Sequence, residues 1–210
     1  MFLSDVDIKK AIKNGEITLD PFSESRLQPA SYDILLGNKF IENDASSTHY
    51  VDPARKIFAK TTEKNVADGE EFVLHPGISV LGLSKEFFGS DHYLVQVGGK
   101  SSLARIGLMI HNTAGIINPG HFLHITFEIT NQSNIPIILR PAMEIAQITF
   151  SKLSSPPARN YKLVGRFAKD NWNHFVDKTS HEKALNVAAG KNKPRTSREK
   201  ALASAKRAKK

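Results

Sequence analysis

The 210-residue sequence predicts a mainly β protein, an antiparallel sandwich or barrel with one or two short helices. One observation supports this fold class, and a second supports a globular domain. From Gly37 onward, short runs of strand-forming residues alternate with clusters of turn-forming residues. The hydrophobic fraction of 40% and the charged fraction of 24% are typical of a globular domain with enough chain to bury a core.

One short helix is expected near the N-terminus. Ser4 can cap its first turn with a hydroxyl group, and Asn14-Gly15 provides a stop. Between them, apolar side chains recur at helical spacing, at Ile8, Ala11 and Ile12. The sequence therefore predicts a helix that begins after Ser4 and presents one apolar face to the rest of the protein.

The strands are expected further along the chain, at residues 78–83, 93–97, 122–130, 135–139 and 144–150. Turn formers separate these runs, at Asp68-Gly69, His75-Pro76-Gly77, Gly98-Gly99, Asn118-Pro119-Gly120 and Arg140-Pro141. A Ser-Ser-Pro-Pro stretch at residues 154–157 marks the exit from the β body.

The formal net charge of +8 is concentrated at the C-terminal end. Residues 181–210 hold 10 of the 29 basic residues and 2 of the 21 acidic ones, so the rest of the chain holds 19 of each. We therefore expect residues 1–178 to form one domain and residues 179–210 to be a basic, flexible tail. Such a tail can bind nucleic acid, but a solvated extension is the favoured interpretation, because no aromatic residues are interleaved to stack bases.

Composition also excludes several classes of protein. The chain has no cysteine, which rules out a disulfide scaffold, a thiolate nucleophile and zinc sites with Cys ligands. No apolar run approaches the roughly 20 residues of a membrane span, and the first 13 residues lack the apolar stretch of a signal peptide. The expected protein is soluble and cytoplasmic, with no membrane partner.

Glu128 lies in the middle of an alternating segment. The apolar side chains point to one face of the strand, and they are Leu123, Ile125, Phe127 and Ile129. The polar side chains point to the opposite face, and they are His124, Thr126, Glu128 and Thr130. Taken alone, this pattern favours the solvated outer face of an antiparallel sheet, where a Glu is ordinary. The pattern by itself does not make Glu128 catalytic.

Residues 98–105 carry a second candidate site, in which two glycines end a strand and are followed by a cation, two hydroxyl groups and an arginine. Freed backbone amides together with Lys and Arg suit the phosphates of a nucleotide. A P-loop is excluded because its first glycine would fall at Leu94. An ordinary strand-to-helix turn is the equally weighted alternative.

The eight histidines of the chain are candidate metal ligands. His121 and His124 form the closest pair, but residues three apart on a strand point to opposite faces, which disfavours chelation. The cysteine-containing signature of zinc-dependent nucleobase deaminases is absent as well. No metal ligands are predicted.

Several ordered motifs run along the chain, namely LSDVDI (3–8), QPASYDILLG (28–37), FVLHPG (72–77), GKSSLARIGL (99–108), HNTAG (111–115), HITFEI (124–129) and RPAMEIAQ (140–147). Together they resemble the dCTP deaminase branch of the trimeric dUTPase superfamily. The resemblance covers about 150 residues, and it implies a distorted β-barrel or jelly-roll subunit, a homotrimer, and active sites between neighbouring subunits.

The resemblance also implies an activity, the hydrolytic deamination of dCTP to dUTP and ammonia without zinc. Glu128 would be the general base that activates a water for attack on C4 of cytosine, while Ser101 and the backbone near Ala114 would hold that water. Ser102 and Arg105 would meet the phosphates, and Mg²⁺ would accompany the triphosphate. The implied catalytic set is Glu128, Ser101, Arg105 and Ala114, and the implied substrate contacts are Lys100, Ser101, Ser102, Arg105, Thr113, Asn118, Gln147, Tyr161, Arg166 and Lys169.

Two departures from the family pattern open alternatives. Family members usually carry Asp where this chain has Asn118, and in dUTPases the matching Asp activates the water that attacks the phosphate chain. An amide cannot accept a proton as a carboxylate does, so dUTP pyrophosphatase activity, alone or in a bifunctional enzyme, is expected to be absent or weak.

The second departure follows Tyr161, where residues 163–175 do not align with the segment that closes over the triphosphate. Arg166 and Lys169 can supply the missing cation, or can be ordinary surface charges. If closure is lost, a catalytically silent regulatory homologue that binds nucleotide becomes the alternative.

Overall fold

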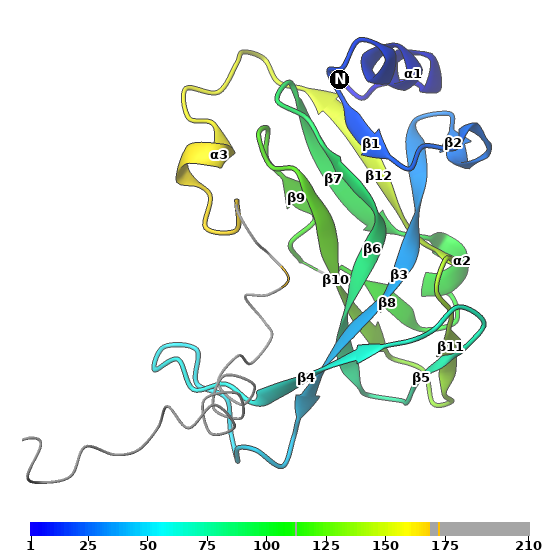
Figure 1. The fold of residues 1–210 in the computed structure, drawn as a ribbon, viewed down its shortest axis with the longest axis vertical. Helices are drawn as coiled ribbons and strands as arrows, with labels where there is room; N and C mark the ends of the chain where they lie inside the picture. Colours follow the sequence, from blue (N-terminus) through cyan, green and yellow to red (C-terminus); the bar gives the residue numbers. More distant parts are fainter. Residues whose placement is uncertain (112, 169–171, 173–210) are drawn as a thin grey trace, which may run out of the picture. The chain divides into compact units, whose positions relative to one another are not determined.

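The structure is a computed structural model that describes residues 1–111, 113–168 and Trp172 (Figure 1). These residues all belong to one compact unit, Met1–Val176. The expected basic tail at residues 179–210 and the candidate site residue Lys169 lie outside the described residues.

A curled antiparallel sheet forms the body of the protein, which confirms the prediction of a mainly β fold. Its strand order is β8-β10-β6-β3-β12-β7-β9, with β1 paired to β6 and with β2 and β4 paired to β3, while β5 and β11 form a separate pair. The strands are β1 (Thr18–Asp20), β2 (Leu27–Gln28), β3 (Ser31–Asp44), β4 (Lys60–Asn65), β5 (Phe72–Leu74), β6 (Ser79–Gly89), β7 (Tyr93–Gly99), β8 (Leu108–Ile110), β9 (Ile116–Ile117), β10 (Leu123–Asn131), β11 (Ile137–Leu139) and β12 (Glu144–Lys152).

The described helices are short, as expected. They are α1 (Asp5–Lys13), the 3₁₀ turn η1 (Glu24–Arg26), α2 (Ser101–Ala104) and α3 (Tyr161–Val164). The predicted N-terminal helix is confirmed in α1, where the Ser4 hydroxyl accepts a hydrogen bond from the backbone N–H of Asp7 and where Ile8 and Ala11 are buried. Among the helices of the described residues, none has the length and apolarity needed to cross a membrane.

All five predicted strands are present, but the longest strand was not predicted. The 14-residue β3 begins at Ser31, before the expected start of the β region, and it runs through Gly37 without a turn. A Cβ atom on Gly37 would lie 2.8 Å from the carbonyl oxygen of Leu83. Gly37 therefore permits β3 and β6 to approach closely at the point where their pairing register shifts, between Leu36 and Phe40.

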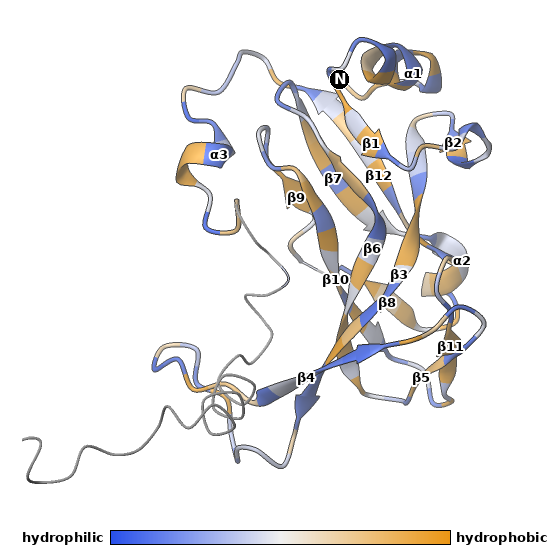
Figure 2. Cartoon of the chain, in the orientation of Figure 1, coloured by the Kyte–Doolittle hydropathy of each residue, from blue (hydrophilic) through white to orange (hydrophobic). Residues whose placement is uncertain are grey.

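Apolar side chains from the central strands fill the core, and Figure 2 shows hydrophobic colouring on these strands and hydrophilic colouring on β4. The rings of Phe40 and Phe72 stack with centroids 4.3 Å apart, and Phe88 and Phe127 are fully buried. Trp172 is 6% exposed, and its indole N–H donates to Glu63 Oε2 on β4 at 2.9 Å.

One ion pair lies inside this core. The guanidinium of Arg26 contacts the carboxylate of Glu86, and the two side chains are 10% and 0% exposed. The second carboxylate oxygen of Glu86 accepts from the backbone N–H of Leu35 at 2.9 Å. Arg26 also donates to the carbonyl oxygen of Pro21 at 2.9 Å and lies over the ring of Tyr32, 4.9 Å from its centroid. The pair thereby joins η1, β3 and β6.

Candidate active site

Strand β10 carries Glu128 and contains a register irregularity a few residues before it. The register against β6 shifts between His124 and Thr126, which is the signature of a β-bulge. The alternation is otherwise as predicted, because Leu123, Ile125, Phe127 and Ile129 are all buried. The solvated outer face was the wrong interpretation for Thr126, which is 7% exposed, while the Glu128 side chain is 46% exposed.

Glu128 faces a pocket of about 240 Å³ between β9, β10 and the segment that contains α3. Its apolar wall comes from the strands, at Ile116, Ile117, Leu123 and Ile125. Its polar and aromatic lining comprises His111, Ala114, Asn118, His121, Thr126, Glu128, Tyr161 and Phe167. An apolar enclosure with a few convergent polar groups is the usual form of a small-molecule site.

His111 lies against Glu128. Its backbone N–H donates to the Glu128 carbonyl oxygen at 2.9 Å, and its ring atom Nδ1 lies 2.7 Å from Glu128 Oε2. The other ring nitrogen, Nε2, lies 3.1 Å from the carbonyl oxygen of Ala114. Because a carbonyl oxygen only accepts, Nε2 carries a proton and donates it there.

The contact at Nδ1 is a close approach to the carboxylate whose direction does not suit a hydrogen bond. Within the described residues, this buried ring nitrogen makes no hydrogen bond despite its short distance to Glu128. The His111 backbone has a φ of +55°, a left-handed conformation that is uncommon for histidine. Sequence reasoning assigned no role to His111, although it opens the HNTAG motif.

Most of the predicted site residues fall into two groups. Glu128, Ala114, Asn118 and Tyr161 come together in the pocket. The group around α2 lies apart from that lining and consists of Lys100, Ser101, Ser102, Arg105 and Gln147. Ser101, Ser102 and Arg105 are exposed. Thr113 is also exposed and lies outside the lining, while the Arg166 guanidinium lies 5.7 Å from the ring centroid of Phe167.

Lys100 and Gln147 are engaged within the sheet. Lys100 Nζ lies 2.7 Å from an Asp33 carboxylate oxygen and 2.6 Å from one of Glu144. Burial alone would lower the pKa of Lys100, but its hydrogen bonds with these two carboxylates outweigh burial and raise it. Gln147 donates to the carbonyl oxygen of Gly99 at 3.3 Å and so supports the strand end that precedes α2.

Two aromatic residues of the C-terminal segment close one side of the pocket. The Tyr161 ring stacks on the His121 ring with centroids 4.3 Å apart and an interplanar angle of 24°. Phe167 lines the same pocket. Sequence reasoning found Tyr161 but missed Phe167, because the stretch after Tyr161 has no recognisable motif.

His121 and His124 do not face a common point. His121 lines the pocket, whereas the His124 ring lies 5.5 Å from that of Phe87. In the part of the chain that the structure describes, no three His, Cys, Asp or Glu side chains are grouped so that they could hold a metal ion.

His121 should make the stability of the protein depend on pH. Burial lowers the pKa of His121 below its ordinary value of 6.5, although a hydrogen bond from its ring to the backbone of Phe167 partly opposes this. The unfolded chain therefore takes up a proton first as the pH falls. The contribution of His121 to stability is fully present above pH 6.5 and is lost progressively below it.

Urea denaturation between about pH 5 and pH 7 measures this dependence. His121→Phe retains a ring that can stack on Tyr161 and should show a smaller loss of stability on acidification. An unchanged pH slope in this variant would mean that other groups cause the acid sensitivity.

Known proteins resemble this chain in sequence over most of its length. The family model described as dCTP deaminase-like matches residues 2–153. A protein of Corynebacterium jeikeium (strain K411) named "dCTP deaminase, dUMP-forming" is 44% identical over 163 residues, which cover 77% of this chain and 86% of that protein. Its namesake in Mycobacterium tuberculosis (strain ATCC 25618 / H37Rv) is 43% identical over 163 residues, with 77% and 85% covered.

A solved structure supports the fold. The crystal structure of 2′-deoxycytidine 5′-triphosphate deaminase from Agrobacterium tumefaciens matches with a TM-score of 0.55 and 22% sequence identity. The match covers 71% of this chain and 46% of that one, so this chain corresponds to just under half of that protein. At this identity the similarity concerns the fold, and it confirms the predicted fold class.

Proposed function

This chain belongs to the dCTP deaminase-like family, and we propose that it catalyses the hydrolytic deamination of dCTP. The observation that carries the proposal is the carboxylate of Glu128, which faces a pocket of about 240 Å³ and lies 2.7 Å from His111 Nδ1. A carboxylate that lines a pocket with an apolar wall suits a general base. The names of the relatives, at 43–44% identity, support the same substrate.

In the proposed reaction, Glu128 takes a proton from a water molecule as the water oxygen bonds to C4 of the cytosine ring. Glu128 passes this proton to the ring nitrogen N3, which gives a tetrahedral C4 that carries a hydroxyl and an amino group. Glu128 then moves the hydroxyl proton to the amino group, the C4–N bond breaks as the C4 carbonyl forms, and dCTP and water have given a uracil nucleotide and ammonia. The polar groups near Ala114 orient the water, and His111 lies beside both partners, with Nε2 bonded to the Ala114 carbonyl oxygen and Nδ1 close to the Glu128 carboxylate. We propose that this step uses no transition metal.

We further propose a homotrimer with sites shared between subunits. The pocket of one subunit holds Glu128 but lacks the cation and hydroxyl groups of Ser101, Ser102 and Arg105, which are exposed at α2. A neighbouring copy that presents its α2 to the pocket would complete a triphosphate site. Mg²⁺ enters with the triphosphate as part of the substrate. We propose that the enzyme works in the cytoplasm, in the supply of dUMP for dTTP synthesis.

The direct test is an analysis of the products formed when the purified full chain is incubated with dCTP and Mg²⁺. Ammonia and a uracil nucleotide should appear in equal amounts. Nucleotide binding without ammonia release would instead support a silent regulatory homologue.

Asn118 bears on which uracil nucleotide the reaction releases, and two products have support. We favour dUTP, because Asn118 lines the pocket and stands where the resemblance to dUTPases implies an Asp that activates water, a role an amide cannot fill. The second candidate is dUMP, which the printed names of the relatives favour.

Replacement of Asn118 with Asp should separate these candidates. If dUTP is the product, Asn118→Asp should add diphosphate release, because general-base assistance contributes about 10²–10⁴-fold to a rate. Chromatography of dUMP, dUTP and diphosphate measures the outcome, with Asn38→Asp on the surface as the matched control. Rapid formation of dUMP by the unaltered chain would overturn our preference for dUTP.

A further inference from the structure

The segment that carries Tyr161 and Phe167 is fastened to the wall of the pocket at a junction of two turns. Asp91, in the turn between β6 and β7, accepts a hydrogen bond from Asn160 Nδ2 through Oδ1 at 3.1 Å. Its Oδ2 atom accepts from Lys162 Nζ at 3.2 Å. Asn160 also caps α3, because its Oδ1 atom accepts from the backbone N–H of Lys162 at 2.9 Å. One carboxylate thus holds both residues that flank Tyr161.

The second turn of the junction is shaped by glycine. Gly120 has a φ of +88°, and its N–H donates to the carbonyl oxygen of Ser90 at 2.8 Å, which ties the two turns together. A Cβ atom on Gly120 would lie 2.0 Å from Asn160 Oδ1, so Asn160 can occupy this place only against a glycine. The backbone N–H of Tyr161 donates to the Pro119 carbonyl oxygen at 3.2 Å.

The ring of Tyr161 makes two close packing contacts. It stacks on His121. It also lies against Gly165, where a Cβ atom would come within 2.2 Å of a Tyr161 ring carbon. Lys162 is held as well, since its ammonium group lies 4.7 Å from the ring centroid of Phe122.

We propose that Asp91 is a positioning residue that keeps Tyr161 and Phe167 over the substrate pocket. This inference rests on the proposed deamination of dCTP in that pocket. Burial alone would raise the pKa of Asp91, but the hydrogen bonds from Asn160 and Lys162 outweigh burial and lower it, so Asp91 is ionised near neutral pH.

The exposure of Asp91 and Lys162 determines how much their contact contributes to docking of the segment. The side chains of Asp91 and Lys162 are 41% and 55% exposed, so each contact contributes little by itself. The contacts act on the same short segment, however, and their loss lowers the fraction of molecules in which the segment is docked. A smaller docked fraction raises the apparent dissociation constant of a ligand in proportion.

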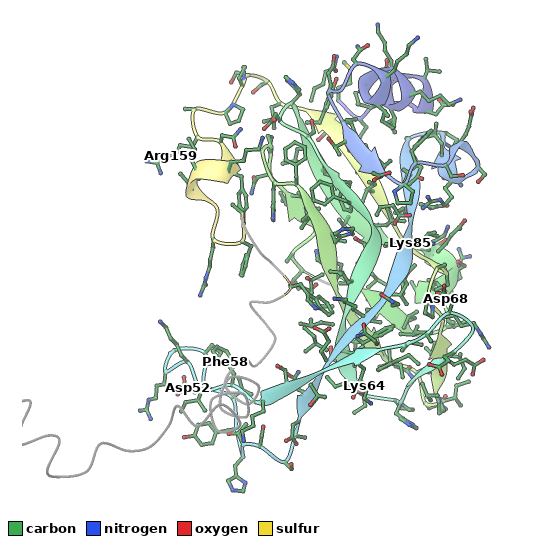
Figure 3. All side chains as sticks on the ribbon, viewed as in Figure 1. Asp52, Phe58, Lys64, Asp68, Lys85 and Arg159 are labelled. Carbon is green, nitrogen blue, oxygen red and sulfur yellow. The ribbon has the colours of Figure 1, made fainter. Side chains whose placement is uncertain are left out.

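Steady-state kinetics of dCTP deamination test the proposal in Asp91→Ala. KM should rise about three- to tenfold while kcat stays within about twofold, because substrate binding recruits the remaining docked molecules. Gly165→Ala should raise KM in the same way, by displacing the Tyr161 ring. Asp68→Ala is the matched control, an exposed turn aspartate on the opposite side of the sheet from Arg159 in Figure 3. An unchanged KM in Asp91→Ala would overturn the proposal.

A double-mutant cycle with Lys162→Met separates a specific contact from general damage. If the two residues act as one unit, the double variant should have about the same KM as Asp91→Ala. Fully additive effects would show that Asp91 does not act through Lys162, and would contradict the proposal.

Limited trypsin digestion gives a readout that does not require turnover. The segment contains Arg159, Lys162 and Arg166 as cleavage sites. Cleavage at these sites should be several-fold faster in Asp91→Ala than in the unaltered chain, with Asp68→Ala unchanged. Should the chain release no ammonia from dCTP at all, the proposed function fails, and equal digestion rates would independently defeat the positioning role.

Discussion

Replacing Glu128 with Gln should slow ammonia release from dCTP by about 10²–10⁴-fold, the usual contribution of a general base. Gln has nearly the same shape as Glu, but its amide cannot take a proton from water. The loss should appear in kcat, because the pocket and the phosphate contacts are unchanged and nucleotide binding is retained. Coupled detection of ammonia measures the rate, and equilibrium binding of dCTP measures the affinity.

Glu70→Gln is the matched control, because Glu70 is an exposed carboxylate whose described hydrogen bond is to the backbone of Ala67. Its rate should equal that of the unaltered chain, and both variants should keep the same melting temperature. Equal deamination rates in Glu128→Gln and the unaltered chain would remove the basis of the proposed mechanism.

The largest expected effect on stability comes from the ion pair of Arg26 and Glu86. Replacing Arg26 with Met should lower the free energy of unfolding by about 3–5 kcal/mol, because it leaves the carboxylate of Glu86 buried without its cation. It also leaves the carbonyl oxygen of Pro21 without the hydrogen bond from Arg26. Urea unfolding at a fixed protein concentration measures the change, since assembly would also affect stability.

The double variant Arg26→Met with Glu86→Leu is the informative control. Replacing both partners with apolar side chains should recover much of the lost stability, because no unpaired charge is left in the core. Arg55→Met, which removes an exposed arginine beside Asp52, should change stability little. If Arg26→Met is as stable as Arg55→Met, the buried pair does not stabilise the fold as described.

The parts of the fold that the sequence predicts are those with local signals. The cap at Ser4 predicts α1, and the alternation around Phe127 predicts β10, because both depend on residues a few positions apart. The β3 strand was missed because the strand pattern was expected to begin only at Gly37, which lies inside β3. What Gly37 provides is space for the carbonyl oxygen of Leu83, which belongs to a strand more than 40 residues away.

The residues of the candidate site likewise divide into those that local sequence patterns predict and those that only the folded chain brings into place. Glu128 and Tyr161 were found because they fall in or beside motifs that resemble a family. The contact of His111 with Glu128 depends on the pairing of β8 with β10 and on the left-handed backbone at His111, neither of which follows from spacing. The place of Phe167 depends on how residues 160–162 dock on the turns at Asp91 and Gly120, which is a property of the folded chain.

The hydrogen bond between Trp172 and Glu63 gives the protein an intrinsic optical probe. Trp172 is the only tryptophan of the chain, it is nearly buried, and it follows the segment that lines the pocket by a few residues. Its fluorescence therefore arises from a single place, where the C-terminal part of the described chain meets β4. Release of this contact, whether by a ligand, by denaturant or by a change in the neighbouring segment, can be followed from the emission wavelength of the native protein without a label.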